Sequence, residues 1–74
     1  MLELSADAMP QKIRELKARL SKAGFFLSRT RGSHTVWNHP TLVTTVVLAG
    51  KDGNDAKPYQ VRDVEAALKA LKDM

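Results

Sequence analysis

Apolar residues recur at helical spacing in two separate segments of this 74-residue chain. The first runs from Pro10 to about Ala23, and its steps of three and four residues predict a helix with one buried stripe, made of Ile13, Leu16, Leu20 and Ala23. Pro10 suits the first helical turn, and Gly24 supplies the usual stop at the other end. The second helix is predicted to begin at Pro58, with an apolar face made of Val61, Val64, Leu68 and Leu71.

Between the two helices the pattern becomes that of β-strands. Three segments are rich in β-branched and aromatic residues, namely Phe25–Thr30, His34–Asn38 and Leu42–Leu48. Two short turns, Arg31–Ser33 and His39–Thr41, separate them, and Pro40 in the second turn cannot donate to a sheet ladder. Connections this short predict two consecutive antiparallel hairpins. A longer loop over Ala49–Lys57 carries ordinary turn residues and leads to the last helix.

The predicted order is α-β-β-β-α, which is an α+β fold. A three-stranded antiparallel sheet is not stable with both faces wet, so both helices are expected to pack on one face and leave the other open. A chain of this length forms one domain with a thin core, and a functional site should therefore be a shallow surface patch. We predict a single domain over residues 9–74, preceded by a flexible leader over residues 1–8, which show no apolar period.

Missing residue types exclude several classes of chemistry. The absence of cysteine removes disulfides, thiolate nucleophiles and cysteine-ligated zinc. With two histidines and few clustered carboxylates, we expect no metal site and no small-molecule cofactor. No apolar run approaches the roughly 20 residues that cross a bilayer, and no signal-peptide pattern is present. The expected location is the cytoplasm, without a membrane partner.

Positive charge is concentrated in the first half of the chain. Residues 9–34 contain seven lysines and arginines but one glutamate, whereas bases and acids balance over residues 35–74. The whole chain has a formal net charge of +4. Such polarisation fits a polyanionic partner such as RNA, and it equally fits a solvated helix face that aids solubility.

The segment Gly24–His34 carries the candidate chemistry. After the first helix and an apolar strand, a Gly-Ser turn delivers His34 close to Arg29 and Arg31. An imidazole titrates near neutral pH, a guanidinium binds phosphate through two hydrogen bonds, and a glycine lets backbone N–H groups approach an anion. This combination suits a phosphodiester. A plainer interpretation is a strand-start histidine bonded to a neighbouring carbonyl and flanked by two exposed arginines.

The same segment resembles the HicA toxin family of bacterial toxin–antitoxin systems. The matching positions after the basic helix are Gly24, Phe25, Arg29, Gly32, Ser33 and His34. The likeness extends from Met9 to about Leu71 and includes the start Met9–Ile13, His39-Pro40 after the second strand, and Lys57-Pro58 before the last helix. One departure is Val47–Ala49, where many members have Pro-x-His near the end of the third strand.

The resemblance implies a fold similar to the double-stranded-RNA-binding domain and an endoribonuclease that cleaves messenger RNA. It also implies His34 as the catalytic residue and a HicB-type antitoxin as protein partner. Cleavage of single-stranded or messenger RNA without a metal needs a base for the 2′-hydroxyl, an acid for the leaving 5′-oxygen and cations near the phosphoryl oxygens. We expect Arg29 and Arg31 to hold the phosphate. Further expected contacts are the Gly32 backbone, Ser33, which would orient His34 or the substrate, and Lys12 from the first helix.

Several alternatives stay open at this level. The acid partner of His34 could be Lys12, Lys17, Tyr59 or water, while His39 is most simply a turn residue. The aromatic residues Phe25, Phe26 and Trp37 could stack on RNA bases or fill the core. Two rival functions also fit the sequence: a non-catalytic RNA-binding module of the same fold, and a basic partner-binding protein without nuclease activity.

Overall fold

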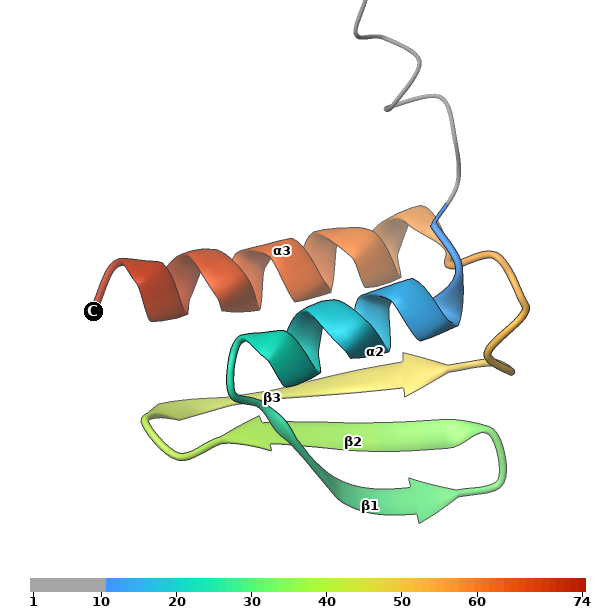
Figure 1. Ribbon diagram of the computed structural model, residues 1–74, viewed down its shortest axis with the longest axis horizontal. Helices are drawn as coiled ribbons and strands as arrows, with labels where there is room; N and C mark the ends of the chain where they lie inside the picture. The colour runs from blue at the N-terminus through green and yellow to red at the C-terminus, as the bar shows by residue number, and fades with distance from the viewer. Residues whose placement is uncertain (1–10) are drawn as a thin grey trace, which may run out of the picture.

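The computed structural model of the protein describes residues 11–74 (Figure 1). Its elements are α2 (Ile13–Lys22), β1 (Phe26–Arg31), β2 (His34–His39), β3 (Leu42–Ala49) and α3 (Pro58–Lys72). This sequence of elements confirms the predicted α-β-β-β-α order. The predicted leader over residues 1–8, and Met9 and Pro10 at the predicted start of the domain, lie outside the described residues.

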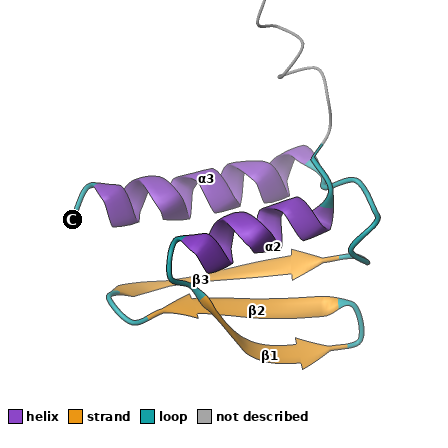
Figure 2. Cartoon of the chain, viewed as in Figure 1, coloured by secondary structure: helices purple, strands orange, loops and turns teal. Residues whose placement is uncertain are grey.

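The three strands form one antiparallel sheet in the order β1-β2-β3. Both helices lie on the same side of this sheet, as expected, and the opposite side carries no covering element in residues 11–74 (Figure 2). The β1–β2 turn, the end of β3 and the start of α2 gather at one end of the molecule, and the β2–β3 turn lies at the other end (Figure 1). Side chains on the β1–β2 turn therefore lie near both the sheet and the start of the helix layer.

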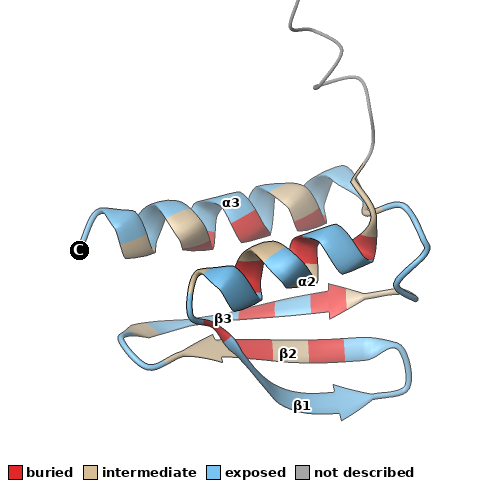
Figure 3. Cartoon of the chain, viewed as in Figure 1, coloured by how far each residue is buried: buried red, intermediate tan, exposed pale blue. Residues whose placement is uncertain are grey.

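The core lies between the sheet and the helices. Its buried residues come from both helices, from the connection between α2 and β1, and from the two covered strands: Leu16, Leu20, Phe25, Trp37, Val46, Leu48, Val64 and Ala67 (Figure 3). The predicted faces are confirmed, although Val61, Leu68 and Leu71 are only partly buried at the edge of the cluster. Burial of each large apolar side chain stabilises the fold by about 1.5–3 kcal/mol. Inside this core the Trp37 indole N–H donates to Thr35 Oγ1 at 2.9 Å, so the ring's polar atom is satisfied.

Gly24 ends the first helix through a Schellman motif. The Phe25 N–H donates to the Leu20 carbonyl and the Gly24 N–H donates to the Ser21 carbonyl, at 2.9 and 3.1 Å. Gly24 has a φ of +101°, a backbone conformation that residues with a Cβ rarely adopt. Because Phe25 completes this cap, β1 begins at Phe26, one residue later than predicted.

The β1–β2 turn is shorter than predicted. It consists of Gly32 and Ser33, and Arg31 is the last residue of β1. Gly32 has a φ of +60°, and no non-glycine residue within 11–74 has a positive φ. Glycine at the first of two central positions is the requirement of a type II′ turn, whose twist matches that of the flanking strands. The two arginines of this hairpin are thereby held in regular strand geometry.

The loop after β3 is fastened to the N-terminus of α2. The N–H groups of Ile13 and Arg14 donate to the carbonyls of Asn54 and Asp52, at 2.9 and 3.1 Å. The first N–H groups of a helix have no partner within the helix, and here the loop main chain supplies it. At the start of α3, Gln60 is buried and its Nε2 donates to the Ala49 carbonyl at 2.9 Å. These bonds fix the end of β3 beside the β1–β2 turn.

Candidate functional site

His34 opens β2 and is exposed. Its neighbour Thr35 is buried on the helix side of the sheet, so strand alternation directs His34 to the open side. Across the β1–β2 ladder the partner of His34 is Arg31, and across the β2–β3 ladder it is Ala49. The imidazole is therefore not enclosed in the core and is accessible to a substrate.

Arg29 and Arg31 share the open face with His34. Arg31 pairs with His34 and Arg29 pairs with Val36, two residues further along β2. Residues that pair directly across a ladder lie on the same face, with Cβ atoms about 4.5–5.5 Å apart. A bulge between Leu27 and Arg29 interrupts the register, but it lies before the two arginines and leaves their alternation intact.

The two arginines give this open face a positive charge. Within residues 11–74 no carboxylate lies within ion-pair distance of Arg29 or Arg31, and both are exposed. The basic residues of α2 differ, because Lys12 Nζ lies 2.6 Å from Asp55 Oδ1 and Lys17 Nζ lies 2.6 Å from Asp52 Oδ1. The positive charge that the sequence places in the first half is thus partly balanced on α2 and unbalanced on β1.

The predicted contacts Gly32 and Ser33 form the turn that joins Arg31 to His34. The Ser33 carbonyl accepts a hydrogen bond from the Gly50 N–H at 3.0 Å, which ties the turn to the loop after β3. A Cβ added to Gly32 would meet no atom within 4 Å, so the backbone there is open to a ligand. Lys12 is the N-cap of α2, its ammonium group is held by Asp55, and the start of α2 lies at the same end of the molecule as this turn (Figure 1).

His39 serves the fold at the opposite end of β2, about 17 Å from His34 given the rise of a strand. Its Nδ1 accepts the Thr41 N–H at 3.1 Å, so its proton is on Nε2, which lies 3.3 Å from the Ala23 carbonyl. The ring also packs edge-on against Phe25, with centroids 5.0 Å apart. His39 is therefore the last residue of β2 and not part of the second turn as predicted, and its contacts are structural.

The aromatic residues divide between core and surface. Phe25 and Trp37 are 4% and 8% exposed and therefore pack inside, whereas Phe26 is 50% exposed. Phe26 pairs with Asn38, and this pair alternates with the inward pair of Leu27 and Trp37, so Phe26 lies on the open face. Of the three aromatic residues that the sequence offers for base stacking, Phe26 is the accessible one.

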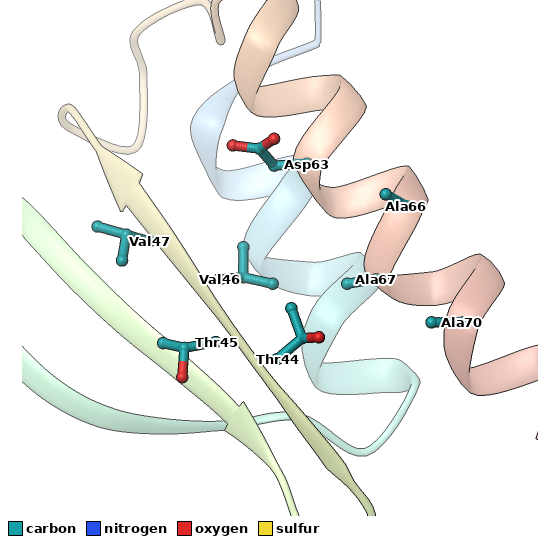
Figure 4. A pocket seen from close by; sticks show the side chains of 8 residues that line it. All are labelled: Thr44, Thr45, Val46, Val47, Asp63, Ala66, Ala67 and Ala70. Carbon is teal, nitrogen blue, oxygen red and sulfur yellow. The ribbon is translucent and has the colours of Figure 1, made fainter.

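A separate shallow groove runs between β3 and α3 (Figure 4). Its volume is about 330 Å³, and the residues that line it are Thr44, Thr45, Val46, Val47, Asp63, Ala66, Ala67 and Ala70. It contains no histidine, lysine or arginine and none of the predicted site residues. The groove therefore adds no chemistry to the candidate site.

Two further observations concern residues 11–74 as a whole. This part of the chain contains no group of three or more histidine, aspartate or glutamate side chains that could hold a metal ion. Neither described helix has the length and apolar character required to span a membrane.

Comparison with known families decides the affiliation of the chain. A family model described as the HicA toxin of bacterial toxin–antitoxin systems matches residues 13–73. The chain belongs to the HicA toxin family. The match includes the Gly24–His34 segment, both helices and all three strands. No curated protein and no solved structure matches the chain.

Membership of the HicA family makes this chain a toxin component, and such a system includes an antitoxin partner. The departure from the Pro-x-His pattern of many HicA members takes on a structural meaning here. Leu48 points into the core, while Val47 and Ala49 alternate with it on the open side, and Ala49 pairs with His34. In this HicA toxin the residue that faces His34 across the β2–β3 ladder is thus an alanine, at the position where the resemblance leads us to expect a second imidazole.

Proposed function

We propose that the protein is an endoribonuclease that cleaves messenger RNA at the open face of the sheet, with His34 transferring the proton and no metal ion required. The observation that carries this proposal is the pairing of Arg31 with His34, with Arg29 on the same face. Two guanidinium groups without carboxylate partners in residues 11–74 then flank one exposed imidazole. A single-stranded segment can reach all three, because no described element covers this face (Figure 2).

The arrangement supports cleavage by the RNA's own 2′-hydroxyl. His34 takes the proton from the 2′-oxygen, which forms a bond to phosphorus while the bond from phosphorus to the 5′-oxygen breaks. The products are a 2′,3′-cyclic phosphate and a 5′-hydroxyl. We assign the proton of the 5′-hydroxyl to water, because His39 lies at the far end of β2, Lys12 and Lys17 are held by Asp55 and Asp52, and Tyr59 lies in the helix layer. One positioned base of this kind contributes about 10²–10⁴-fold in rate.

Arg29 and Arg31 would bind the scissile phosphate and stabilise the negative charge that develops on it during cleavage. Charge-assisted hydrogen bonds from arginine are roughly twice as strong as neutral ones, and the planar guanidinium can hold two phosphoryl oxygens at once. Gly32 allows its backbone to approach the same phosphate, and Ser33 orients His34 or the substrate. Phe26, half exposed on this face, can stack on a base, an interaction worth about 1–3 kcal/mol. Lys12 would contribute a more distant phosphate contact after exchanging Asp55 for the RNA.

The antitoxin is proposed to be of the HicB type and to cover this same face. A surface with two guanidinium groups that have no carboxylate partner within residues 11–74 is best complemented by acidic side chains, which would meet Arg29 and Arg31 and bury His34. Inhibition then follows from occlusion of the imidazole, and it needs no change in the toxin's fold.

The deciding experiment compares the unaltered chain with His34→Ala after induction in the same cells, with growth and RNA integrity followed. We expect growth arrest and RNA cleavage with the unaltered chain and neither with His34→Ala. Arg62→Ala on the exposed side of α3 is the matched control and should behave as the unaltered chain. Both purified variants are then tested on single-stranded RNA at matched amounts, after circular dichroism has verified the fold.

Full RNA cleavage by folded His34→Ala would refute the catalytic assignment. Binding of duplex RNA without any cleavage would identify a non-catalytic RNA-binding module instead. A chain that neither cuts nor binds RNA, yet captures an acidic partner, would identify a partner-binding protein.

A further inference from the structure

A hollow of about 710 Å³ lies on the helix side of the sheet, next to the β1–β2 turn. It exists because neither helix covers β1, all six residues of which are exposed (Figure 3). Its walls come from α2, the helix side of β1, the turn itself and the loop after β3. We call it the α2–β1 hollow. Its volume is within the range of about 300–1,000 Å³ that small-ligand sites occupy.

The lining of this hollow combines the groups that a nucleotide needs. Lys17 and Lys51 supply two ammonium groups, Thr30 and Ser33 supply hydroxyls, and Leu27 supplies an apolar wall with 49% of its surface exposed. Ammonium groups attract phosphate, hydroxyls can pair with ribose, and an apolar side chain can contact a base. Asp52 brings the one carboxylate, so two positive charges face one negative charge.

The hollow and the open face are two sides of one turn. Thr30 pairs with Thr35 on the helix side, whereas the next pair, Arg31 and His34, lies on the open side. One residue step along β1 therefore separates a wall of the hollow from the guanidinium beside the proposed catalytic imidazole. An RNA strand that crosses the Gly32–Ser33 turn touches both.

We propose that the α2–β1 hollow is an RNA-binding subsite, which holds the nucleotide next to the phosphodiester cleaved at His34. The proposal deepens the proposed function and takes its cleavage site from it. The hollow binds through Lys17 and Lys51, and Asp52 opposes that binding because it competes with the phosphate for Lys17. The Asp52 side chain is 63% exposed, so its carboxylate can return to water when a phosphate takes its place beside Lys17.

Asp52 offers a clean test because its main chain and its side chain act separately. Its carbonyl accepts the Arg14 N–H and so helps to fix the loop, while its carboxylate contacts Lys17. Asp52→Asn keeps the main-chain bond and the side-chain shape, and it removes the negative charge. The variant should therefore fold normally and present an uncompensated Lys17 in the hollow.

The experiment measures the affinity of the full chain for a single-stranded 2′-fluoro RNA by fluorescence anisotropy. This probe lacks the 2′-hydroxyl nucleophile, so binding is read without cleavage. We expect Lys51→Ala to weaken binding on the order of threefold to tenfold and to lower the salt slope by about 0.7, the loss of one phosphate contact on a single strand. Asp52→Asn should bind more tightly by a similar factor, and Lys72→Ala, at the distant end of α3, should match the unaltered chain.

Equal weakening by Lys51→Ala and Lys72→Ala would show attraction by overall charge and would overturn the proposal. An unchanged affinity in Asp52→Asn, or no binding of the RNA by the unaltered chain, would also overturn it. Cleavage of unmodified RNA is assayed separately. If the chain binds in the hollow as described but His34→Ala cuts as well as the unaltered chain, the catalytic assignment fails and the subsite stands.

Discussion

His34 and Ala49 are cross-strand partners at the end of the β2–β3 ladder. The Ala49 carbonyl is held by Gln60 Nε2 at 2.9 Å, and the neighbouring Gly50 N–H is held by the Ser33 carbonyl at 3.0 Å, so this pair is fixed from both sides. The resemblance set out above would place the histidine of the Pro-x-His pattern at position 49. With alanine at this position the leaving-group proton comes from water in the proposed reaction, where a side-chain acid would fit.

Ala49→His is expected to accelerate RNA cleavage. A second imidazole would face His34 with Cβ atoms about 4.5–5.5 Å apart and could protonate the 5′-oxygen. We expect a gain of at least about tenfold in kcat, out of the 10²–10⁴-fold that a positioned acid contributes. Single-turnover cleavage of a fluorogenic RNA measures it. Val47→His, one pair further from His34 on the same face, is the control, and an equal gain there would contradict the pairing argument.

Arg31→Ala is expected to lower kcat/KM for RNA cleavage by about 10- to 100-fold, because one charge-assisted hydrogen bond to phosphate is worth about 1.5–3 kcal/mol. Arg31→Lys should recover part of this loss, since it keeps the charge and loses the two-pronged geometry. Steady-state cleavage rates over a range of RNA concentrations measure both variants. If the lysine variant were as weak as the alanine variant despite a normal fold, phosphate neutralisation would not be the role of Arg31.

Gly24→Ala is expected to destabilise the fold more than Gly32→Ala. Both positions have positive φ values, which cost about 1–3 kcal/mol for a residue with a Cβ. A Cβ at Gly24 would in addition lie 3.0 Å from His39 Nε2, whereas none of the surrounding atoms lies within 4 Å at Gly32. Urea denaturation measures the difference.

A double-mutant cycle with His39→Ala separates the contact from the backbone strain at Gly24. In the His39→Ala background the cost of Gly24→Ala should fall to about that of Gly32→Ala, because the ring that opposes the new methyl group is gone. Strictly additive costs would show that the ring does not restrict position 24.

Association with the antitoxin is expected to slow as salt rises. If acidic side chains meet Arg29 and Arg31, the on-rate should fall by about tenfold or more between low and high ionic strength, because salt screens long-range attraction. Stopped-flow mixing measures the rate. The double variant Arg29→Ala and Arg31→Ala should flatten this dependence, and a rate that is unaffected by salt in the unaltered chain would argue for an apolar interface.

Much of the fold was predictable because local patterns and tertiary packing agree. The apolar steps from Ile13 to Leu20 give α2, and Gly24 ends it as expected. The even spacing of Arg29 and Arg31 predicts a shared face, and the short turn preserves it. Boundaries moved by one residue where a turn needed fewer residues than predicted, as at Arg31 and His39, or where a helix cap took one more, as at Phe25. The first helix begins at Ile13 and not at Pro10 as predicted, because Gln11 and Lys12 pair with the loop after β3.

The features that could not be predicted depend on contacts between residues that are distant in sequence. Lys12 and Lys17 meet Asp55 and Asp52 because the loop after β3 closes onto α2, and spacing along the chain gives no sign of it. The α2–β1 hollow forms because two helices of this length leave β1 uncovered, which the pattern within β1 does not encode. The pairing of His34 with Ala49 depends on the β2–β3 register and could not be read from either strand alone.

The attachment of the Asp52–Asn54 carbonyls to the start of α2 has a consequence for biosynthesis. A ten-residue helix is marginal in water when isolated, so α2 depends on partners that the ribosome delivers some forty residues later. The β1–β2 hairpin will emerge before either helix can pack behind it. The nascent toxin should therefore acquire its competent surface only after the loop that follows β3 has been synthesised.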